Sequence, residues 1–358
     1  MIYTADEKAL IWLCACTDLG LREKAALLRA APSPQILFEE FEKFYAQVIL
    51  KGQNGVYKKR DLAARERQIG DLLSEMSRKG YFAVTCLHSD YPDPLKTADP
   101  PFVLFGAGNR ALLSEEKFCI VGSRTTPSWA EKLGTRIAET LSAHFTIVTG
   151  LAEGGDLAAI KGAKGSGKLI CVLPCGLDEC YPAAHMSIKE EIKKKGLLLS
   201  ELPFGEKVHK GSFHARNRIL AGLSKGVLVL SAGEKSGALI TANYAIDYGR
   251  DVFAFPYSLG FAHGAGCNKL IKKGAFLCTD ANDILDGYGI VLREKKRIAL
   301  SSQEELILNA LKESERLHSA EIAERVNLQI YEAAAFLSSL ELKGLVVKVG
   351  GNMYKAIE

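Results

Sequence analysis

Hydrophobic positions follow three different patterns along the chain. In the first part they recur at helical spacing, as in residues 5–16 and 22–30. A longer amphipathic stretch over residues 56–79 ends at Gly80, a residue type that commonly stops helices. The pattern predicts a small all-α domain over residues 1–80.

From residue 81 to about residue 290, short apolar runs alternate with amphipathic segments. The apolar runs predict buried strands over residues 81–87, 102–105, 117–121, 145–149, 168–173, 197–200, 226–230, 251–255 and 275–278. The amphipathic segments predict helices over residues 128–143, 153–164, 184–195, 216–223, 237–248 and 268–273. Because strands that alternate with helices form parallel sheets covered on both faces, this region is expected to be an α/β domain.

The last part of the chain follows a charged linker over residues 290–303. Three helical segments, 304–313, 319–326 and 331–342, precede a hairpin pattern over residues 345–356. Three helices followed by a hairpin is the order of a winged helix. The expected domains are therefore residues 1–80, 81–290 and 301–358.

Composition places the chain among ordinary globular proteins. Its 358 residues are 47% hydrophobic and 25% charged. No apolar run reaches the length of about 18 residues that a membrane span needs, and the N-terminal residues do not resemble a signal peptide. The nine cysteines show no CxxC spacing and are expected to be buried thiols. We expect a cytoplasmic protein without a membrane partner.

The positive charge is concentrated in the middle of the chain. Residues 81–300 carry 27 Lys and Arg against 22 Asp and Glu, whereas residues 301–358 carry 6 against 9. A polyanionic partner is therefore expected to bind the middle region.

Three glycine-containing turns lie next to predicted strands or helices of that region. Gly122-Ser123-Arg124 follows the strand over 117–121, Gly150 follows the strand over 145–149, and Ser236-Gly237 opens a helix. Ligands bind at the carboxyl ends of strands in such sheets, where glycine allows close approach and helix N–H groups face an anion. Arg124 could add a bidentate contact to a phosphate. Asp156, at the start of a helix, is expected to hold the second turn rather than to act as a general acid.

The richest cluster lies between residues 207 and 218. It combines cations, an aromatic residue and an amide: Lys207, His209, Lys210, Phe213, His214, Arg216, Asn217 and Arg218. Cations attract a phosphate backbone, and an interleaved aromatic side chain can stack on a base. Alternatively, Arg216 and Arg218 could be ion-pair partners within the rim of the sheet.

Catalytic and metal-binding patterns are weak by comparison. No Ser/His/Asp or Cys/His arrangement stands out, and the lysine of Gly165-Ser166-Gly167-Lys168 precedes a strand rather than a helix. We expect no catalytic residue, metal or cofactor. One alternative stays open on chemistry alone, a nucleoside monophosphate phosphoribohydrolase-like enzyme that uses a glycine-rich phosphate loop with Glu201 and Arg124. A transcription regulator is a third hypothesis, against which the acidic winged helix argues.

Taken together, the motifs of residues 81–280 resemble the DNA-processing DprA (Smf) family. The matching blocks run in family order: Tyr91-Pro92, Pro100-Pro101, Gly122-Ser123-Arg124, Gly150-Leu151-Ala152 with Gly154 and Asp156, Leu173-Pro174 with Tyr181-Pro182, Ser200-Glu201 with Pro203, Phe213 with Arg216-Asn217-Arg218, Ser236-Gly237 with Thr241-Ala242, Gly249-Arg250, Pro256, and Asn268 with Leu270-Ile271 and Gly274-Ala275. Each block is weak alone, but their order and spacing are specific. The chain departs from the family at Gly155, usually isoleucine, at Thr149, usually serine, and at Tyr257, usually glycine.

The resemblance implies an extended Rossmann-like domain that binds single-stranded DNA, forms a homodimer and promotes RecA loading in natural transformation, or competence. It also implies an N-terminal domain of the sterile-alpha-motif or helix-hairpin-helix type and a C-terminal winged helix. Arg124 is then expected to hold a phosphate with Lys210 as its basic neighbour, and Phe213 to pack against a base. The residues expected to form the DNA site are Gly122, Ser123, Arg124, Gly150, Lys210, Phe213, Arg216, Asn217, Arg218, Ser236 and Gly237.

The winged helix differs from those that read DNA. Such domains usually carry cations on the third helix and the wing. Here the third helix has Glu332 and Glu341 against Lys343, and the domain is net negative. We predict that it binds DNA poorly and serves as a protein-contact or regulatory module.

Overall fold

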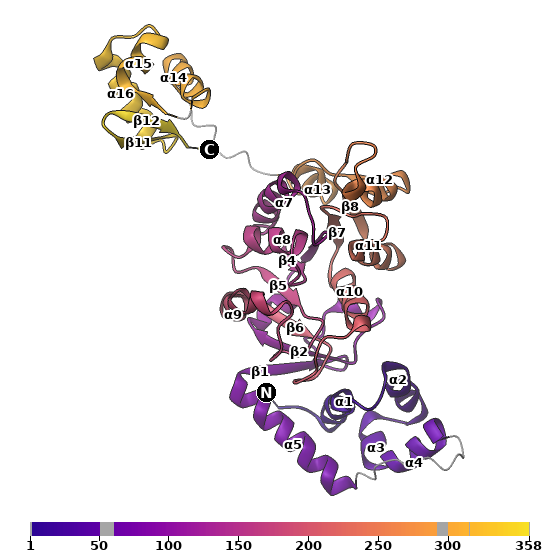
Figure 1. The fold of residues 1–358 in the computed structure, drawn as a ribbon. Helices are drawn as coiled ribbons and strands as arrows, with labels where there is room; N and C mark the ends of the chain where they lie inside the picture. The colour runs from indigo at the N-terminus through magenta and orange to yellow at the C-terminus, as the bar shows by residue number, and fades with distance from the viewer. Residues whose placement is uncertain (1, 51–60, 292–299, 315, 358) are drawn as a thin grey trace. The chain divides into compact units, whose positions relative to one another are not determined.

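The computed structural model describes residues 2–50, 61–291, 300–314 and 316–357, apart from the side chain of Lys210. The chain forms two compact units, Met1–Val291 and Leu292–Glu358 (Figure 1). The first holds the N-terminal helices and a nine-stranded sheet, and the second holds the C-terminal helices and a three-stranded sheet.

The N-terminal helices are α1 (Ala5–Ala15), α2 (Leu21–Ala30), α3 (Pro34–Glu39), α4 (Phe41–Tyr45), the π-helix η1 (Ala46–Leu50) and α5 (Leu62–Lys79). Thr4 caps α1 and Asp61 caps α5 through side-chain oxygens that accept backbone N–H groups. Helix α1 packs on α3 and α5, with the Trp12 ring edge-on to Phe41. Part of the predicted segment 56–79 lies outside the described residues. Because these helices share a compact unit with the sheet, a separate domain ending at residue 80 stays a prediction.

The large sheet is mostly parallel. Its strands are β1 (Tyr81–Thr85), β2 (Val103–Gly108), β3 (Lys117–Val121), β4 (Thr146–Thr149), β5 (Leu169–Val172), β6 (Leu197–Ser200), β7 (Gly226–Val229), β8 (Asp251–Ala254) and β9 (Phe276–Leu277). Their order is β1-β2-β6-β5-β4-β3-β7-β8-β9. All neighbours from β6 to β9 pair in parallel, whereas β2 pairs antiparallel with both β1 and β6. The expected α/β architecture is confirmed, with an antiparallel pair added at one edge.

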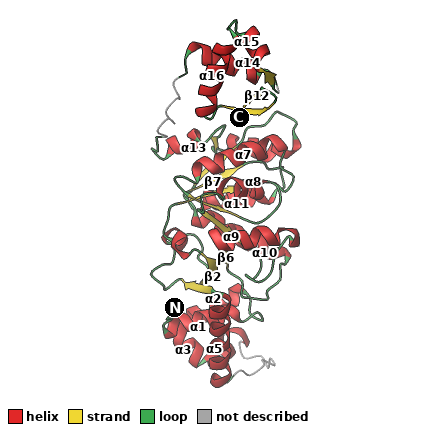
Figure 2. Cartoon of the chain, turned by 90° about the vertical axis from the view of Figure 1, so that its left-hand side faces the viewer, coloured by secondary structure: helices red, strands yellow, loops and turns green. Residues whose placement is uncertain are grey.

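Helices cover both faces of this sheet (Figure 2). They are α6 (Asp93–Lys96), η2 (Arg110–Leu113), α7 (Ser128–Leu141), α8 (Gly155–Ala163), η3 (Ala183–His185), α9 (Met186–Lys195), α10 (Lys210–Leu223), α11 (Gly237–Asp247), η4 (Ala262–Gly264), α12 (Ala265–Lys272) and α13 (Asn282–Gly287). Helices α10 and α11 pack together on one face, and α7 and α8 pack together on the other.

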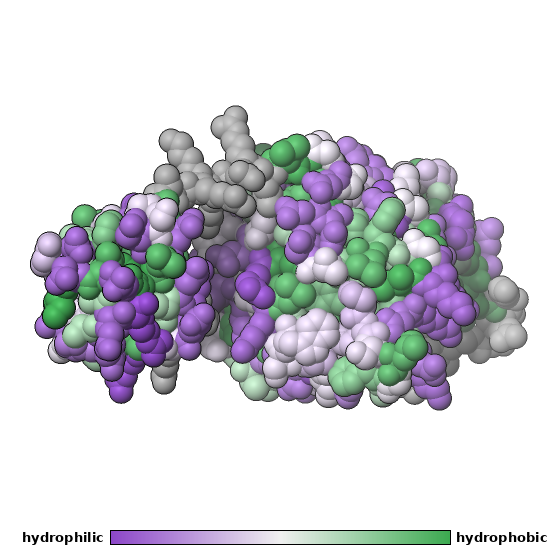
Figure 3. Space-filling model, turned by 90° about the horizontal axis from the view of Figure 1, so that it is seen from above, coloured by the Kyte–Doolittle hydropathy of each residue, from purple (hydrophilic) through white to green (hydrophobic). Residues whose placement is uncertain are grey.

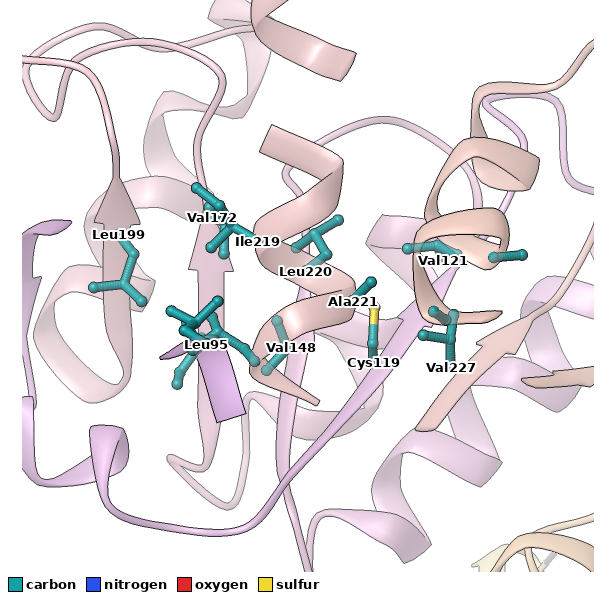
Figure 4. Packing of buried hydrophobic residues seen from close by; sticks show 14 of the residues in the cluster. Leu95, Cys119, Val121, Val148, Val172, Leu199, Ile219, Leu220, Ala221 and Val227 are labelled. Carbon is teal, nitrogen blue, oxygen red and sulfur yellow. The ribbon is translucent and has the colours of Figure 1, made fainter. Parts of the chain in front are cut away.

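Alternate strand residues supply the core beneath α10. Ile219, Leu220 and Ala221 of α10 are buried against Val148, Val172 and Cys119 of the strands (Figure 4). Burying a valine, leucine or isoleucine side chain stabilises the fold by about 1.5–3 kcal/mol. The core therefore fixes the position of α10, which carries much of the candidate site. The nine cysteines are free thiols, buried or half-buried as expected.

The second unit has the expected order of a winged helix. It contains α14 (Ser302–Lys312), β10 (Leu317–His318), α15 (Ser319–Arg325), α16 (Ile330–Leu342), β11 (Val346–Gly350) and β12 (Met353–Ala356). Ile307, Ile322 and Leu337, one from each helix, meet in its core. The short strand β10, which the hydrophobic pattern did not predict, pairs with β12.

On the face seen in Figure 3, hydrophobic residues lie among hydrophilic ones. Among the helices that the structure describes, none combines the length and the apolar character needed to cross a membrane.

Candidate functional site

The candidate site lies where the strand order reverses, between β3 and β7. The chain proceeds from β3 through β4, β5 and β6 toward one edge, and from β7 through β8 and β9 toward the other. Crevices at such reversals are the usual ligand sites of open α/β sheets. A cavity of about 360 Å³, named here the switch-point pocket, is lined by Val121, Gly122, Ser123, Arg124, Ala152, Asp156, Phe213, Arg216, Asn217, Leu220, Ser236, Gly237, Ala238 and Thr241.

Backbone contacts fix the turn after β3. The Ser123 N–H donates to the carbonyl oxygen of Ser231 at 2.9 Å, and the Thr126 hydroxyl donates to the Ser123 carbonyl at 2.7 Å. Gly154, in the turn after β4, has a φ of +68°, and a Cβ there would lie 2.2 Å from the Ser123 carbonyl oxygen. Only glycine meets both demands, so Gly154 lets the two turns pack backbone against backbone.

Arg124 is the exposed cation of the pocket. Its guanidinium carbon lies 5.3 Å from the centre of the Phe213 ring and 5.8 Å from that of Tyr181. The two rings meet edge-to-face, with their centres 5.4 Å apart. Within the described ranges, Arg124 has ring contacts but neither an ion pair nor a hydrogen bond. Its N–H donors therefore remain available to an anionic ligand.

Arg216 is buried, lines the switch-point pocket and holds neighbouring elements through its hydrogen bonds. Its Nη1 donates to the Val172 carbonyl at 2.5 Å, and its Nε donates to Oδ1 of Asn217 at 3.1 Å. The Asn217 amide donates in turn to the Gly237 carbonyl at 3.3 Å, which ties α10 to the start of α11. Burial lowers the pKa of Arg216, and the nearby Asp156 carboxylate opposes that shift.

Asp156 holds the turn after β4, as the sequence predicted. Its carboxylate accepts the Ala152 N–H at 3.2 Å. Burial raises the pKa of Asp156, while the Arg216 guanidinium and the Ala152 N–H favour its charged form. A Cβ on Gly150 would lie 2.3 Å from Oδ2 of Asp156 and 2.5 Å from Nη1 of Arg216. The glycine therefore leaves room for this carboxylate and guanidinium.

The pocket brings together most of the predicted site residues, namely Gly122, Ser123, Arg124, Phe213, Arg216, Asn217, Ser236 and Gly237. Gly150 and Arg218 do not line it. Arg218 forms an ion pair with Glu201 and donates to the Asp99 carbonyl at 2.5 Å. Lys210 begins α10, but its side chain lies outside the described part of the chain.

Tyr181 was not among the predicted site residues. Tyr181-Pro182 was named among the blocks that resemble the family, but no role in the site was predicted for Tyr181. The sequence could have indicated Tyr181 as a site residue, because it is an aromatic residue in a loop at the same sheet edge as Arg124. Over the described residues, no group of three or more His, Cys, Asp or Glu side chains is arranged to hold a metal ion.

Glu201, the glutamate of the enzyme alternative, lines a second cavity of about 560 Å³ with residues of the α1–α2 turn. Burial is the main cause that raises the pKa of its carboxyl, and Arg218 opposes the shift. Arg216 lines both cavities, whereas Arg124 lines only the switch-point pocket of the two. The structure therefore does not bring Glu201 and Arg124 into one cavity.

Comparison with known proteins assigns both units to one family. A family model for DNA recombination-mediator protein A matches residues 82–289, and a model for the DprA winged helix domain matches residues 293–352. The DNA processing protein DprA of Streptococcus pneumoniae is 40% identical over 220 residues, 61% of this chain and 78% of that protein. Protein Smf of Escherichia coli is 35% identical over 277 residues, 73% of each.

Solved structures give the same assignment. The X-ray structure of DprA from S. pneumoniae superposes with a TM-score of 0.64 at 32% identity, covering 80% of this chain and 98% of that one. A Helicobacter pylori DNA processing protein A structure, described for its single-stranded DNA binding mode, superposes with a TM-score of 0.53 at 32% identity. It covers 59% of this chain and 97% of that one. The chain belongs to the DprA (Smf) family of DNA recombination-mediator proteins.

Proposed function

We propose that the switch-point pocket binds single-stranded DNA, with Arg124 holding a phosphate and Phe213 and Tyr181 offering ring surface to a base. The observation that carries the proposal is the exposed Arg124 guanidinium, which lies over two aromatic rings at the reversal of strand order. A phosphate between it and the backbone N–H groups of the neighbouring turns would gain charge-assisted hydrogen bonds.

Helix starts add to the attraction for an anion. Helix α11 begins at Gly237 and α8 begins at Gly155, beside the pocket and its neighbouring turn. The aligned peptide dipoles of a helix place partial positive charge at its N-terminus. Ser236 caps α11 and its hydroxyl lies at the pocket, where it can donate to a phosphate oxygen.

The remaining predicted residues take supporting roles in this proposal. Arg216 and Asn217 hold α10 against β5 and α11, and Gly150 leaves room for the Asp156 carboxylate. Arg218 supports the rim after β6 through Glu201. We propose Lys210 for a second phosphate contact, because it is a basic residue at the start of α10, the helix that carries Phe213.

A single strand suits this site better than a duplex. The aromatic rings contact Arg124 at a cavity of about 360 Å³, so a base must leave its stack to reach them. The relative from H. pylori, described for its single-stranded DNA binding mode, supports this preference.

Family membership supports a proposal for the biological role. We propose that the chain is a cytoplasmic homodimer, joined through the Rossmann-like domain, that protects incoming DNA and promotes RecA loading during natural transformation. A phosphoribohydrolase-like reaction is less well supported, because Glu201 pairs with Arg218 and lies outside the switch-point pocket.

The proposal is tested by titrating wild type and Arg124→Ala with labelled single-stranded and duplex DNA at several salt concentrations. Losing a hydrogen bond to a charged partner costs about 1.5–3 kcal/mol, so the affinity of the variant is expected to fall about ten- to hundredfold. The slope of log affinity against log salt should fall by about 1. Arg124→Lys, which keeps the charge without the planar fork, should be intermediate.

Arg67→Ala is the matched control, because it removes the same charge from an exposed position on α5. It should leave affinity and salt slope near wild type. Equal affinities for Arg124→Ala and Arg67→Ala would contradict the proposal. Release of free base from nucleoside monophosphates, without affinity for DNA, would favour the phosphoribohydrolase-like alternative.

A further inference from the structure

Four aromatic side chains form a strip next to the switch-point pocket. This aromatic strip consists of Trp129, Tyr257, Phe261 and His263. The Trp129 and Tyr257 rings are 5.1 Å apart between centres, and the Tyr257 and Phe261 rings stack at 5.7 Å with only 4° between their planes. His263 follows at 5.6 Å from Phe261. The strip therefore offers several ring faces in succession.

Trp129, Phe261 and His263 of the strip are exposed and Tyr257 is half-buried, although the rings are large and mostly apolar. Trp129 is 47% exposed and Phe261 is 40% exposed, while one side of Trp129 stacks on the fully buried Phe255. His263 is exposed as well. Clustered exposed aromatic side chains commonly mark a binding surface, whereas single ones are unremarkable.

The centre of the strip is rigidly held. The Tyr257 hydroxyl donates to the Leu230 carbonyl at 2.6 Å, and its backbone N–H and carbonyl both bond to the Asn268 side chain. A Cβ on Gly264 would lie 2.0 Å from the Tyr257 ring, so the missing side chain there makes room for it. A ring fixed in advance loses little freedom when a ligand stacks on it.

The strip is continuous with the turn that carries Arg124. The Thr125 hydroxyl lies 3.0 Å from the Ser123 hydroxyl and 3.2 Å from Nδ1 of His263. Trp129 lies in the first turn of α7, which follows β3, and Tyr257 follows β8. Strip and pocket therefore share the carboxyl edge of the parallel sheet.

We propose that the aromatic strip is a second stacking platform that carries single-stranded DNA beyond the switch-point pocket; this inference rests on the function proposed above. A strand held by Arg124 at one phosphate places its next nucleotides along the same sheet edge. Bases stack on aromatic rings regardless of sequence, which suits a protein that must accept any strand. The strip is thus assigned to binding a longer stretch of strand than the pocket alone can hold.

The affinity test compares strand lengths. Trp129→Leu with Phe261→Leu removes two ring faces, while leucine still covers Phe255. Single-strand sites span from about 4 to about 16 nucleotides, and each stacked base contributes enough to change affinity about five- to hundredfold. The double variant should therefore bind a strand of about 16 nucleotides at least tenfold more weakly and bind one of about 4 nucleotides like wild type.

Tryptophan fluorescence reads the contact directly. The chain contains two tryptophans, and Trp12 is only 2% exposed. Stacking on Trp129 should quench the emission when the long strand binds but not when the short one does. In Trp129→Leu, where Trp12 alone emits, the quenching should disappear. Tyr331→Ala, which removes an exposed aromatic from the winged helix, is the control and should behave like wild type.

Two failures can be told apart. In the first, the long strand does not quench Trp129 and binds the double variant as tightly as wild type, while Arg124→Ala still weakens binding. The strip is then not a DNA platform and is interpreted as a protein-contact surface. If Arg124→Ala binds both strands like wild type, the proposed function itself fails.

Discussion

The switch-point pocket and the winged helix are two regions of this chain that could bind DNA, and they use their charges differently. In the pocket, Arg124 is exposed and lies over aromatic rings without an ion pair or hydrogen bond to another described residue. In the winged helix, Lys343 at the end of α16 bonds both carboxylate oxygens of Glu304. Lys348 on the wing lies over the Tyr354 ring.

The difference shows why a domain type alone does not locate a DNA site. Winged helices read DNA when cations on the third helix and the wing face outward. Here Glu332 lies in the first turn of α16, the third helix. Lys343, which follows the last residue of α16, forms an ion pair with Glu304 of α14. The acidic winged helix is therefore proposed to contact protein, or to regulate, rather than to hold a strand.

Of the variants that test this comparison, Gly154→Ala is expected to have the largest effect on stability and on DNA binding by the switch-point pocket. A side chain there must adopt a φ of +68° and meets the Ser123 carbonyl oxygen at 2.2 Å. With a ψ of −115°, this backbone lies outside the left-handed helical region as well, so it costs a residue other than glycine more than the about 1–2 kcal/mol of that region, and the collision adds to the cost. The turns after β3 and β4 should move apart and displace Arg124. Both the unfolding midpoint and the affinity for single-stranded DNA should fall.

Gly165→Ala is the control, since a Cβ at this glycine meets nothing within 4 Å. It should leave DNA affinity at the wild-type level. Retention of full affinity by Gly154→Ala would show that the packing of the two turns does not set the geometry of the pocket.

A smaller effect is expected in the winged helix from Glu304→Gln. Bonds from Lys343, Ser301 and Ser339 lower the pKa of Glu304 from its ordinary value near 4.5 to about 2. A carboxyl whose pKa is lowered on folding stabilises the folded state at every pH above its ordinary pKa. This contribution is lost as the pH falls from about 4.5 to about 2. At pH 7 the variant should unfold at a lower temperature than wild type.

Thermal unfolding of the full chain between pH 7 and pH 2 measures this effect. The difference between Glu304→Gln and wild type should shrink toward the acid end, and DNA affinity at neutral pH should not change. A constant difference across that range would mean that the Glu304 charge does not stabilise the winged helix.

The sequence predicted much of the sheet because its strands are short, uninterrupted apolar runs. The bounds of β3 and β6 agree with the expected residues 117–121 and 197–200. The strand order and the antiparallel β1–β2 pair were not predicted, because both depend on contacts between segments far apart in the chain. Local hydrophobic patterns carry no information about which strands become neighbours.

Helix α10 shows most clearly what the pattern missed. The expected helix over residues 216–223 begins instead at Lys210, since the polar first turns lack apolar periodicity. On a helix, Phe213, Arg216 and Asn217 are spaced three and four residues apart and therefore share the face toward the pocket. Arg218 lies on another face, which explains why it pairs with Glu201 outside the pocket. A cluster interpreted as one basic segment thus divides into two structural roles.

The most direct test of the account measures single-stranded DNA binding against salt for the full chain, for residues 1–291 and for residues 292–358, the two compact units. The account predicts that residues 1–291 keep the affinity and the salt slope of the full chain, whereas residues 292–358 bind weakly. Tight, salt-sensitive binding by residues 292–358, with loss of binding by residues 1–291, would contradict it.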